Sequence, residues 1–217
     1  MLDVLGPAVQ PGRRHAPIVV RAGGTAVTAA LSARRAGAAV VVAGRVGADV
    51  AGESIRAELA RAGVDARLAV DEELPTGTYV ELGPAAVVSR GANSRLVPAD
   101  VPELGIDAVL VSGYVVAHDD TLPAGRHALS LAAPWRAVTA VPIAGPDFAA
   151  RARGANVLFA NAAEAGLAGQ AYEIVCVTHG AEGATVTREG STEHVPPTGD
   201  AGTGAGDAFA GAYLAGL

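Results

Sequence analysis

The sequence is poor in cysteine and has no long apolar run. Its 217 residues include a single cysteine, Cys176, which excludes an internal disulfide. Cys176 lies in the apolar run 174–177, where a buried strand is the ordinary interpretation. No apolar stretch approaches the roughly 20 residues that cross a bilayer, and no charged leader precedes an apolar segment at the N-terminus. We therefore expect a cytoplasmic protein with no membrane partner.

Basic and aromatic residues are also scarce. Lys and Arg number 16 against 22 Asp and Glu, a formal net charge of −6, and the basic residues form no stripe. Nucleic-acid binding needs a concentrated positive surface, so we expect no nucleic-acid partner. Half of the residues are hydrophobic but only 4% are aromatic, so Ala, Val and Leu must supply most of the core. The length fits a single domain, residues 1–217.

Apolar strands and Ala-rich helices alternate along most of the chain. Residues 25–35 carry alanines at helical spacing and are followed by Gly37, which is typical of a helix end. Continuous apolar runs of four to six residues predict strands buried on both faces. The predicted strands are 39–43, 108–111, 137–141, 156–160 and 173–178, and the other predicted helices include 52–62 and 205–217. This alternation predicts an α/β fold with a mostly parallel sheet flanked by helices.

The pattern changes between residues 64 and 95. Short segments at 67–70, 78–82 and 85–88 predict strands, and the last two are joined across Gly83 and Pro84. We expect residues 64–95 to form a small β lid, with residues 4–20 as a further candidate part.

The strongest chemical signal is Thr203-Gly204-Ala205-Gly206-Asp207, a glycine turn that leads into an Ala-rich helix. Glycines let backbone N–H groups face a bound anion, and the first turn of a helix adds partial positive charge. A phosphoryl group could bind there, and the aspartate could accept the proton of an attacking hydroxyl. A plain helix start with an acidic residue in its first turn explains the same residues equally well.

This segment resembles the Asp-Thr-Thr-Gly-Ala-Gly-Asp signature of the PfkB, or ribokinase-like, family of carbohydrate kinases. The resemblance implies that the amides of Gly204, Ala205 and Gly206 form an anion hole for the transferred phosphoryl group and that Asp207 is the catalytic base. It also implies a ribokinase-like, Rossmann-like fold with a small β lid, and ATP and Mg²⁺ as cofactors.

The N-terminal half resembles the acceptor-binding half of the same family. The paired glycines at 23 and 24 and the Gly-x-Val-Gly-x-Asp-x-x-Gly stretch that begins at Gly44 both match family segments. The resemblance implies that Asp3, Gly23, Gly24 and Thr28 bind the acceptor. Thr28 stands where the family has asparagine, and a hydroxyl offers fewer donors and acceptors than an amide.

Two later segments resemble the nucleotide side of the family. Asn161 and Glu164 match an Asn-x-x-Glu motif that organises magnesium and its waters, so Glu164 is the expected metal residue, through water. A strand-end Asn with a helix-start Glu is equally a capping arrangement. Thr178, Gly180 and Gly183 match Val-Thr-x-Gly-x-x-Gly, which passes close to the nucleotide.

The sequence departs from the family pattern at several places. Ala201 and Gly202 stand where the family has Asp-Thr, and Asp200 is displaced by one, so activation by a monovalent cation is doubtful. The match to the family also predicts that the chain begins just after the first core strand, near Asp3, and stops close to the helix of Asp207.

The leading hypothesis is an ATP-dependent kinase that phosphorylates a hydroxyl of a sugar or sugar-like molecule, with a nucleoside as the alternative acceptor and a homodimer formed through the lid. A second hypothesis is a truncated, catalytically impaired homologue that acts as a binding or dimerisation module. A nicotinamide-dependent oxidoreductase is poorly supported, because the Gly-x-Gly-x-x-Gly turn after a first strand is missing.

Overall fold

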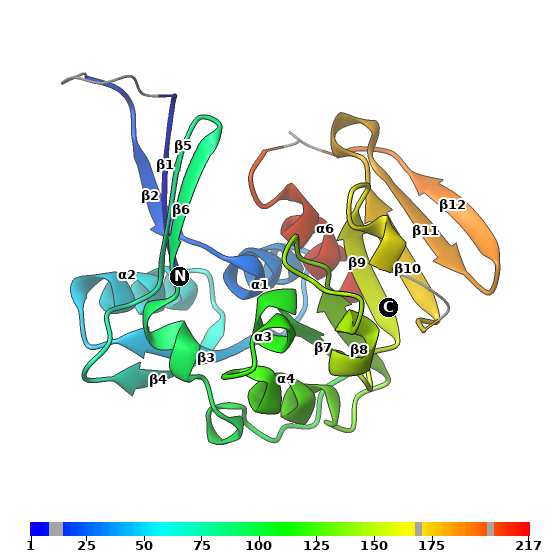
Figure 1. The fold of residues 1–217 in the computed structure, drawn as a ribbon, viewed down its shortest axis with the longest axis horizontal. Coiled ribbons are helices and arrows are strands. Elements are labelled where there is room, and N and C mark those ends of the chain that lie inside the picture. Colours follow the sequence, from blue (N-terminus) through cyan, green and yellow to red (C-terminus); the bar gives the residue numbers. More distant parts are fainter. Residues whose placement is uncertain (9–14, 168–170, 199–201) are drawn as a thin grey trace.

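A six-stranded sheet forms the centre of the C-terminal half (Figure 1). The computed structural model describes residues 1–8, 15–167, 171–198 and 202–217. The spatial order is β12-β11-β10-β9-β8-β7; β7 to β10 are mutually parallel, β11 pairs antiparallel with β10, and β12 pairs antiparallel with β11. The strands are β7 (Ala108–Val111), β8 (Trp135–Thr139), β9 (Val157–Asn161), β10 (Ile174–Thr178), β11 (Ala184–Arg188) and β12 (Ser191–Val195).

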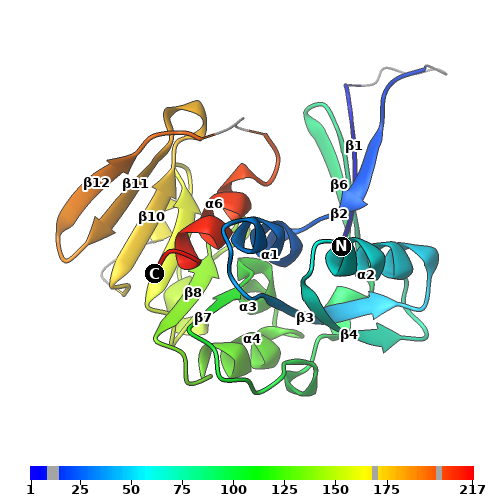
Figure 2. The ribbon, with the colours of Figure 1, turned by 180° about the vertical axis from the view of Figure 1, so that it is seen from behind.

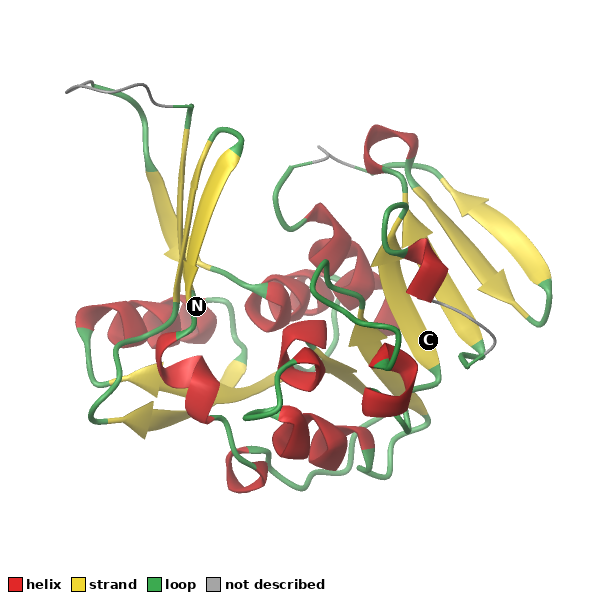
Figure 3. Cartoon of the chain, in the orientation of Figure 1, coloured by secondary structure: helices red, strands yellow, loops and turns green. Residues whose placement is uncertain are grey.

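Both faces of this sheet are covered by helices, which explains its continuous apolar strands. Alternate residues of β9 belong to different cores: Leu158 packs with Phe148, whereas Val157 and Phe159 pack with Ala210. The first core involves α3 (Gly113–Ala117), α4 (Leu122–Leu129) and α5 (Phe148–Arg151), and the second involves α6 (Ala205–Leu214). The predicted α/β architecture is therefore confirmed, and Figure 3 shows helices and strands in these layers.

Few aromatic residues are available, and three of them meet on the α6 face of the sheet. The Phe159 ring lies edge-on to Phe209 and Tyr213, with centroid distances of 6.1 and 5.9 Å. These contacts hold the helix that carries Asp207 against β9. Cys176 of β10 is fully buried in the same core, as its apolar run predicts, and burial raises the pKa of its thiol to about 12.

The N-terminal half has its own two-stranded parallel sheet. Strand β3 (Val41–Gly47) pairs with β4 (Asp65–Asp71), and α1 (Thr25–Arg35) and α2 (Val50–Arg61) pack against it through a separate core that includes Ile55 and Leu59. Within the described residues, β3 and β7 are not paired with each other. The two halves are instead joined through the close packing of α1 against α6.

A four-stranded sheet stands away from these layers (Figures 1 and 2). Its order is β2-β1-β5-β6, and it contains β1 (Leu2–Gly6), β2 (Val19–Ala22), β5 (Thr78–Leu82) and β6 (Ala85–Ser89). We call these four strands the lid. The sequence prediction placed residues 67–70 in the lid, but β4 pairs in parallel with β3 instead, because its strand pattern does not encode its partner.

Candidate active site

The glycine turn and α6 have the geometry that an anion site requires. Gly204 has φ 87°, in the left-handed region that favours glycine, and it is the N-cap of α6. The Ala205 amide donates to the carbonyl oxygen of Gly202 at 3.0 Å. Helix geometry leaves the amides of Gly206 and Asp207 without intrahelical acceptors, and none of the described residues accepts from them, so these two can donate to a bound anion. Of the predicted anion-hole residues, Gly206 is therefore best placed to bind a phosphoryl oxygen.

Asp207 lies in the first turn of α6 and lines a cavity of about 210 Å³. Burial is the main cause that raises the pKa of this carboxyl to about 6; a hydrogen bond with Thr25 opposes the rise, and the nearby carboxylates of Asp3 and Glu164 add to it. A base with a pKa near the working pH is suited to accepting a proton during catalysis. The cavity is also lined by Thr178, Gly204, Gly206, Asn161 and Tyr114.

None of the four predicted acceptor residues lines this cavity, but Gly24 directly precedes Thr25, which does. Asp3 is 5% exposed, and its Oδ1 has no hydrogen-bond partner among the described residues. A side chain at Gly23 would overlap the Asp3 carboxylate, so this position requires glycine. Burial is the main cause that raises the pKa of Asp3. Thr28 lies on α1, and its Cγ2 is 3.1 Å from the point where a Cβ on Gly204 would lie, so α1 supports the glycine turn.

Asn161 and Glu164 form a reciprocal pair at the carboxyl end of β9. The backbone N–H of Glu164 donates to Asn161 Oδ1 at 3.1 Å, and the backbone N–H of Asn161 donates to Glu164 Oε2 at 3.2 Å. This is the capping arrangement that the sequence left open. Both side chains also line the Asp207 cavity and a neighbouring one of about 400 Å³. Their oxygens are of the kind that Mg²⁺ prefers, so a metal role stays a prediction beside the capping contacts.

The third predicted segment is brought only partly to the site. Thr178 lines the Asp207 cavity, and its Oγ1 is 3.7 Å from the Cβ position of Gly206. Gly180 and Gly183 line neither of the two cavities. Gly183 has φ 89°, and a side chain there would overlap the carbonyl oxygen of Val195, so the hairpin alone requires glycine at that position. Asp200 and Ala201, on which the prediction about a monovalent cation rests, lie outside the described residues.

Sequence reasoning missed Tyr114, which lines the Asp207 cavity. Burial raises the pKa of its hydroxyl, as do the charges of Glu164 and Asp207. Tyr114 lies in α3, just after β7, and follows Gly113. The Gly113 amide donates to Thr139 Oγ1 at 3.0 Å, and any side chain at Gly113 would overlap the Thr139 carbonyl oxygen. The available signal was position: ligand sites in parallel sheets lie at the carboxyl ends of strands.

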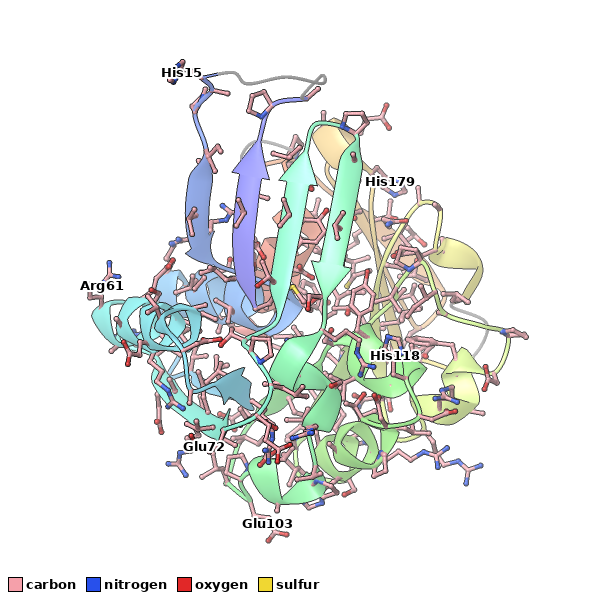
Figure 4. The ribbon with its side chains drawn as sticks, turned by 60° about the vertical axis from the view of Figure 1, so that its left-hand side comes forward. His15, Arg61, Glu72, Glu103, His118 and His179 are labelled. Atoms are coloured by element: carbon pink, nitrogen blue, oxygen red, sulfur yellow. The ribbon has the colours of Figure 1, made fainter. Side chains whose placement is uncertain are left out.

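The histidines take no part in this site. Figure 4 shows His15, His118 and His179 at separate places on the molecule. His179 Nε2 lies 3.0 Å from Thr185 Oγ1, a contact within the β10–β11 region. In the part of the chain that the structure describes, no three His, Cys, Asp or Glu side chains are grouped to hold a metal ion. Nor do those residues include a helix long and apolar enough to cross a membrane.

Comparisons with known proteins agree with this architecture. Residues 5–217 match the family described as pfkB family carbohydrate kinase. A comparison with curated protein sequences found no match. Solved structures give strong matches. Aminoimidazole riboside kinase from Salmonella enterica is 21% identical, with a TM-score of 0.78, 100% of this chain covered and 82% of that one.

Two other solved structures contain nucleotides. Fructokinase from Vibrio cholerae O395, in its fructose, ADP and calcium ion bound form, is 24% identical with a TM-score of 0.73, covering 97% of this chain and 80% of that chain. A ribokinase II candidate from E. coli, in complex with ATP and Mg²⁺, is 18% identical with a TM-score of 0.80, covering 99% and 82%. These similarities confirm the predicted fold.

Proposed function

Since the chain belongs to the pfkB family of carbohydrate kinases, we propose that it transfers the γ-phosphoryl group of ATP to a hydroxyl of a sugar or nucleoside. One observation carries this proposal above the family level. A partly buried carboxylate, Asp207, lies in the first turn of a glycine-capped helix, in one cavity with Glu164. A base and an anion site thus lie next to each other, as phosphoryl transfer requires.

Asp207 accepts the proton of the acceptor hydroxyl as that oxygen attacks the γ-phosphorus. The new O–P bond forms while the bond between the γ-phosphorus and the β–γ bridging oxygen breaks, and ADP leaves with that oxygen. The amides of Gly206 and Asp207 stabilise the charge on the transferred group. Gly204 and Ala205 shape the turn that presents these amides.

The acceptor is assigned to the side of the cavity nearest the lid. Asp3 supplies a buried carboxylate oxygen that has no partner among the described residues, as expected for an atom that accepts a hydrogen bond from an acceptor hydroxyl. Gly23 leaves room for that carboxylate, Gly24 supplies a left-handed backbone with φ 79°, and Thr28 contributes a hydroxyl from α1. Fructose and aminoimidazole riboside, present in the names of two similar structures, represent the sugar and nucleoside-like classes to test.

ATP and Mg²⁺ are proposed on the other side of Asp207. The larger cavity adjoins the catalytic one, and Asn161 and Glu164 line both. Their oxygens fit a hard divalent cation, held chiefly through water, which when bound neutralises charge on the phosphates. Thr178 extends this side toward Gly180 and Gly183 at the entrance to the β10–β11 hairpin. A cytoplasmic location, where ATP is supplied, stays a prediction.

A homodimer through the lid is also proposed. Val20, Val4, Val80 and Val87 are register partners across the four strands and so form one apolar row on the lid. Val20 is 59% exposed and Val87 70% exposed. This row lies on the outer face of the lid, whereas Asp3, Arg21 and Glu81 lie on the inner face. Among the described residues, the outer face carries no charged side chain. An exposed apolar face without charge suits contact with a second copy of the chain.

The decisive experiment measures ADP formation by the purified chain with ATP, Mg²⁺ and a panel of sugars and nucleosides. Turnover with one acceptor, lost in Asp207→Ala, is the expected result. A folded chain that binds ATP but phosphorylates no acceptor would favour the alternative of a catalytically impaired homologue that serves as a binding or dimerisation module.

A further inference from the structure

The lid is tied to the catalytic turn through one residue, Thr203. The Thr203 hydroxyl donates to the Glu81 carboxylate, with distances of 2.9 Å to Oε1 and 3.1 Å to Oε2. The Arg21 guanidinium donates to the Thr203 carbonyl oxygen at 3.2 Å. Glu81 belongs to β5 and Arg21 to β2, so two lid strands hold a residue that is 122 and 182 positions away in the sequence.

Glu81 is itself held in place on the inner face of the lid. The Tyr79 hydroxyl donates to Glu81 Oε2 at 2.6 Å, and this bond is the main cause that raises the pKa of Tyr79 to about 12. Tyr79 and Arg21 are both register partners of Asp3 on β1. The proposed acceptor-binding carboxylate and the residues that hold Thr203 therefore share one face of one sheet.

Thr203 directly precedes Gly204, the residue whose left-handed backbone starts α6. Because only Gly204 separates Thr203 from the helix, the position of Thr203 sets the direction of the N–H groups that follow. The lid contacts therefore act on the anion site through the backbone, not by touching the transferred group.

Building on the proposed function, we propose that Glu81 is a positioning residue which, through Thr203, holds the anion site in its productive place. An acceptor bound at Asp3 shares the inner face of the lid with Arg21 and Tyr79, so its binding steadies the lid strands that hold the glycine turn.

A direct role for Glu81 in acceptor binding makes different predictions. If Glu81 bound the acceptor directly, its replacement would change mainly the KM for the acceptor, and the effects of replacing Glu81 and Thr203 would add. A residue that works through Thr203 would change mainly kcat, and removing both partners would cost no more than removing either one.

The test uses Glu81→Ala, Thr203→Val and their double variant. We expect kcat to fall about 10- to 100-fold in each single variant, the size typical of a hydrogen bond to a charged group, with little change in acceptor KM. The double variant should fall no further. Thr203→Ser keeps the hydroxyl and should restore kcat. Glu193→Ala and Thr192→Val, at exposed positions on β12, are matched controls that should leave kcat unchanged.

A second measurement does not depend on activity. Amide hydrogen exchange over residues 202–208 should be faster in Glu81→Ala and Thr203→Val than in the parent chain, and unchanged in the β12 controls. Unchanged exchange, or additive losses that fall on acceptor KM, would overturn the proposal. If even the parent chain phosphorylates no acceptor, the proposed function fails, and the exchange measurement still decides whether Glu81 holds the turn.

Discussion

Replacing Asp207 with asparagine is expected to stabilise the fold at neutral pH while it removes the proposed catalytic base. The pKa of the Asp207 carboxyl rises from its ordinary value of 3.8 to about 6, chiefly because the group is buried. The difference is about two pKa units, and at about 1.36 kcal/mol for each unit it amounts to about 3 kcal/mol. Asparagine has a similar shape and does not ionise, so it avoids this cost.

The sign follows from proton linkage. The folded chain binds the Asp207 proton more tightly than the unfolded chain, so the contribution of this group to stability is fully present below pH 3.8 and is lost as the pH rises through about 6. The free energy of unfolding of Asp207→Asn, minus that of the parent, should therefore increase between pH 4 and pH 8, by at most about 3 kcal/mol. Against total stabilities of about 5 to 15 kcal/mol, such a change is measurable.

Urea unfolding at several pH values in this range measures the difference, with Asp107→Asn, at an exposed loop position, as the matched control. In parallel, kcat/KM of the parent should fall as the pH drops below about 6, and Asp207→Asn should lose about 10²- to 10⁴-fold in kcat. A stability difference that does not change with pH would refute the argument that burial of Asp207 raises its pKa.

Three further predictions concern packing, the metal and assembly. Gly211→Ala should lower the free energy of unfolding by about 1 to 3 kcal/mol, because the new Cβ would overlap the Ala29 carbonyl oxygen of α1. The control is Gly206→Ala in the same helix, which should not lower it, because the nearest atom to its Cβ is 3.7 Å away. Equal losses of stability for the two variants in urea unfolding would contradict this prediction. Glu164→Gln should raise the Mg²⁺ concentration for half-maximal rate by about 10-fold or more, measured by Mg²⁺ titration; an unchanged titration would remove Glu164 from the metal site. Val87→Glu should shift sedimentation from dimer to monomer, whereas a parent that is already monomeric would rule out the lid dimer.

The parts of the site that are local in sequence could be predicted from the sequence. The Gly204 turn and Asp207 are neighbours along the chain, and their residue types are themselves the backbone and charge requirements of an anion site. The helix at 25–35 was likewise predicted with the bounds that the structure shows. In these places, the local pattern and the tertiary structure require the same residues.

Features that depend on pairing between distant segments could not be predicted. The pattern of β4 fits a lid hairpin as well as a partner for β3, and only the packed structure decides between them. Glu81 and Thr203 are 122 positions apart, and neither belongs to a recognisable local motif with the other. Tyr114 was missed because its importance arises from where β7 ends, not from its own neighbours in the sequence.

The packing of α1 against α6 also sets the order in which the protein can fold. α1 begins at residue 25 and α6 at residue 205, so this contact closes a very long loop. Such distant contacts form late, because the entropy of loop closure must be overcome first. During synthesis, the apolar surface of α1 therefore stays without its helical partner until α6 has left the ribosome. The candidate base Asp207 therefore reaches the fold on the same ten-residue segment, Ala205–Leu214, that supplies the helical partner of α1.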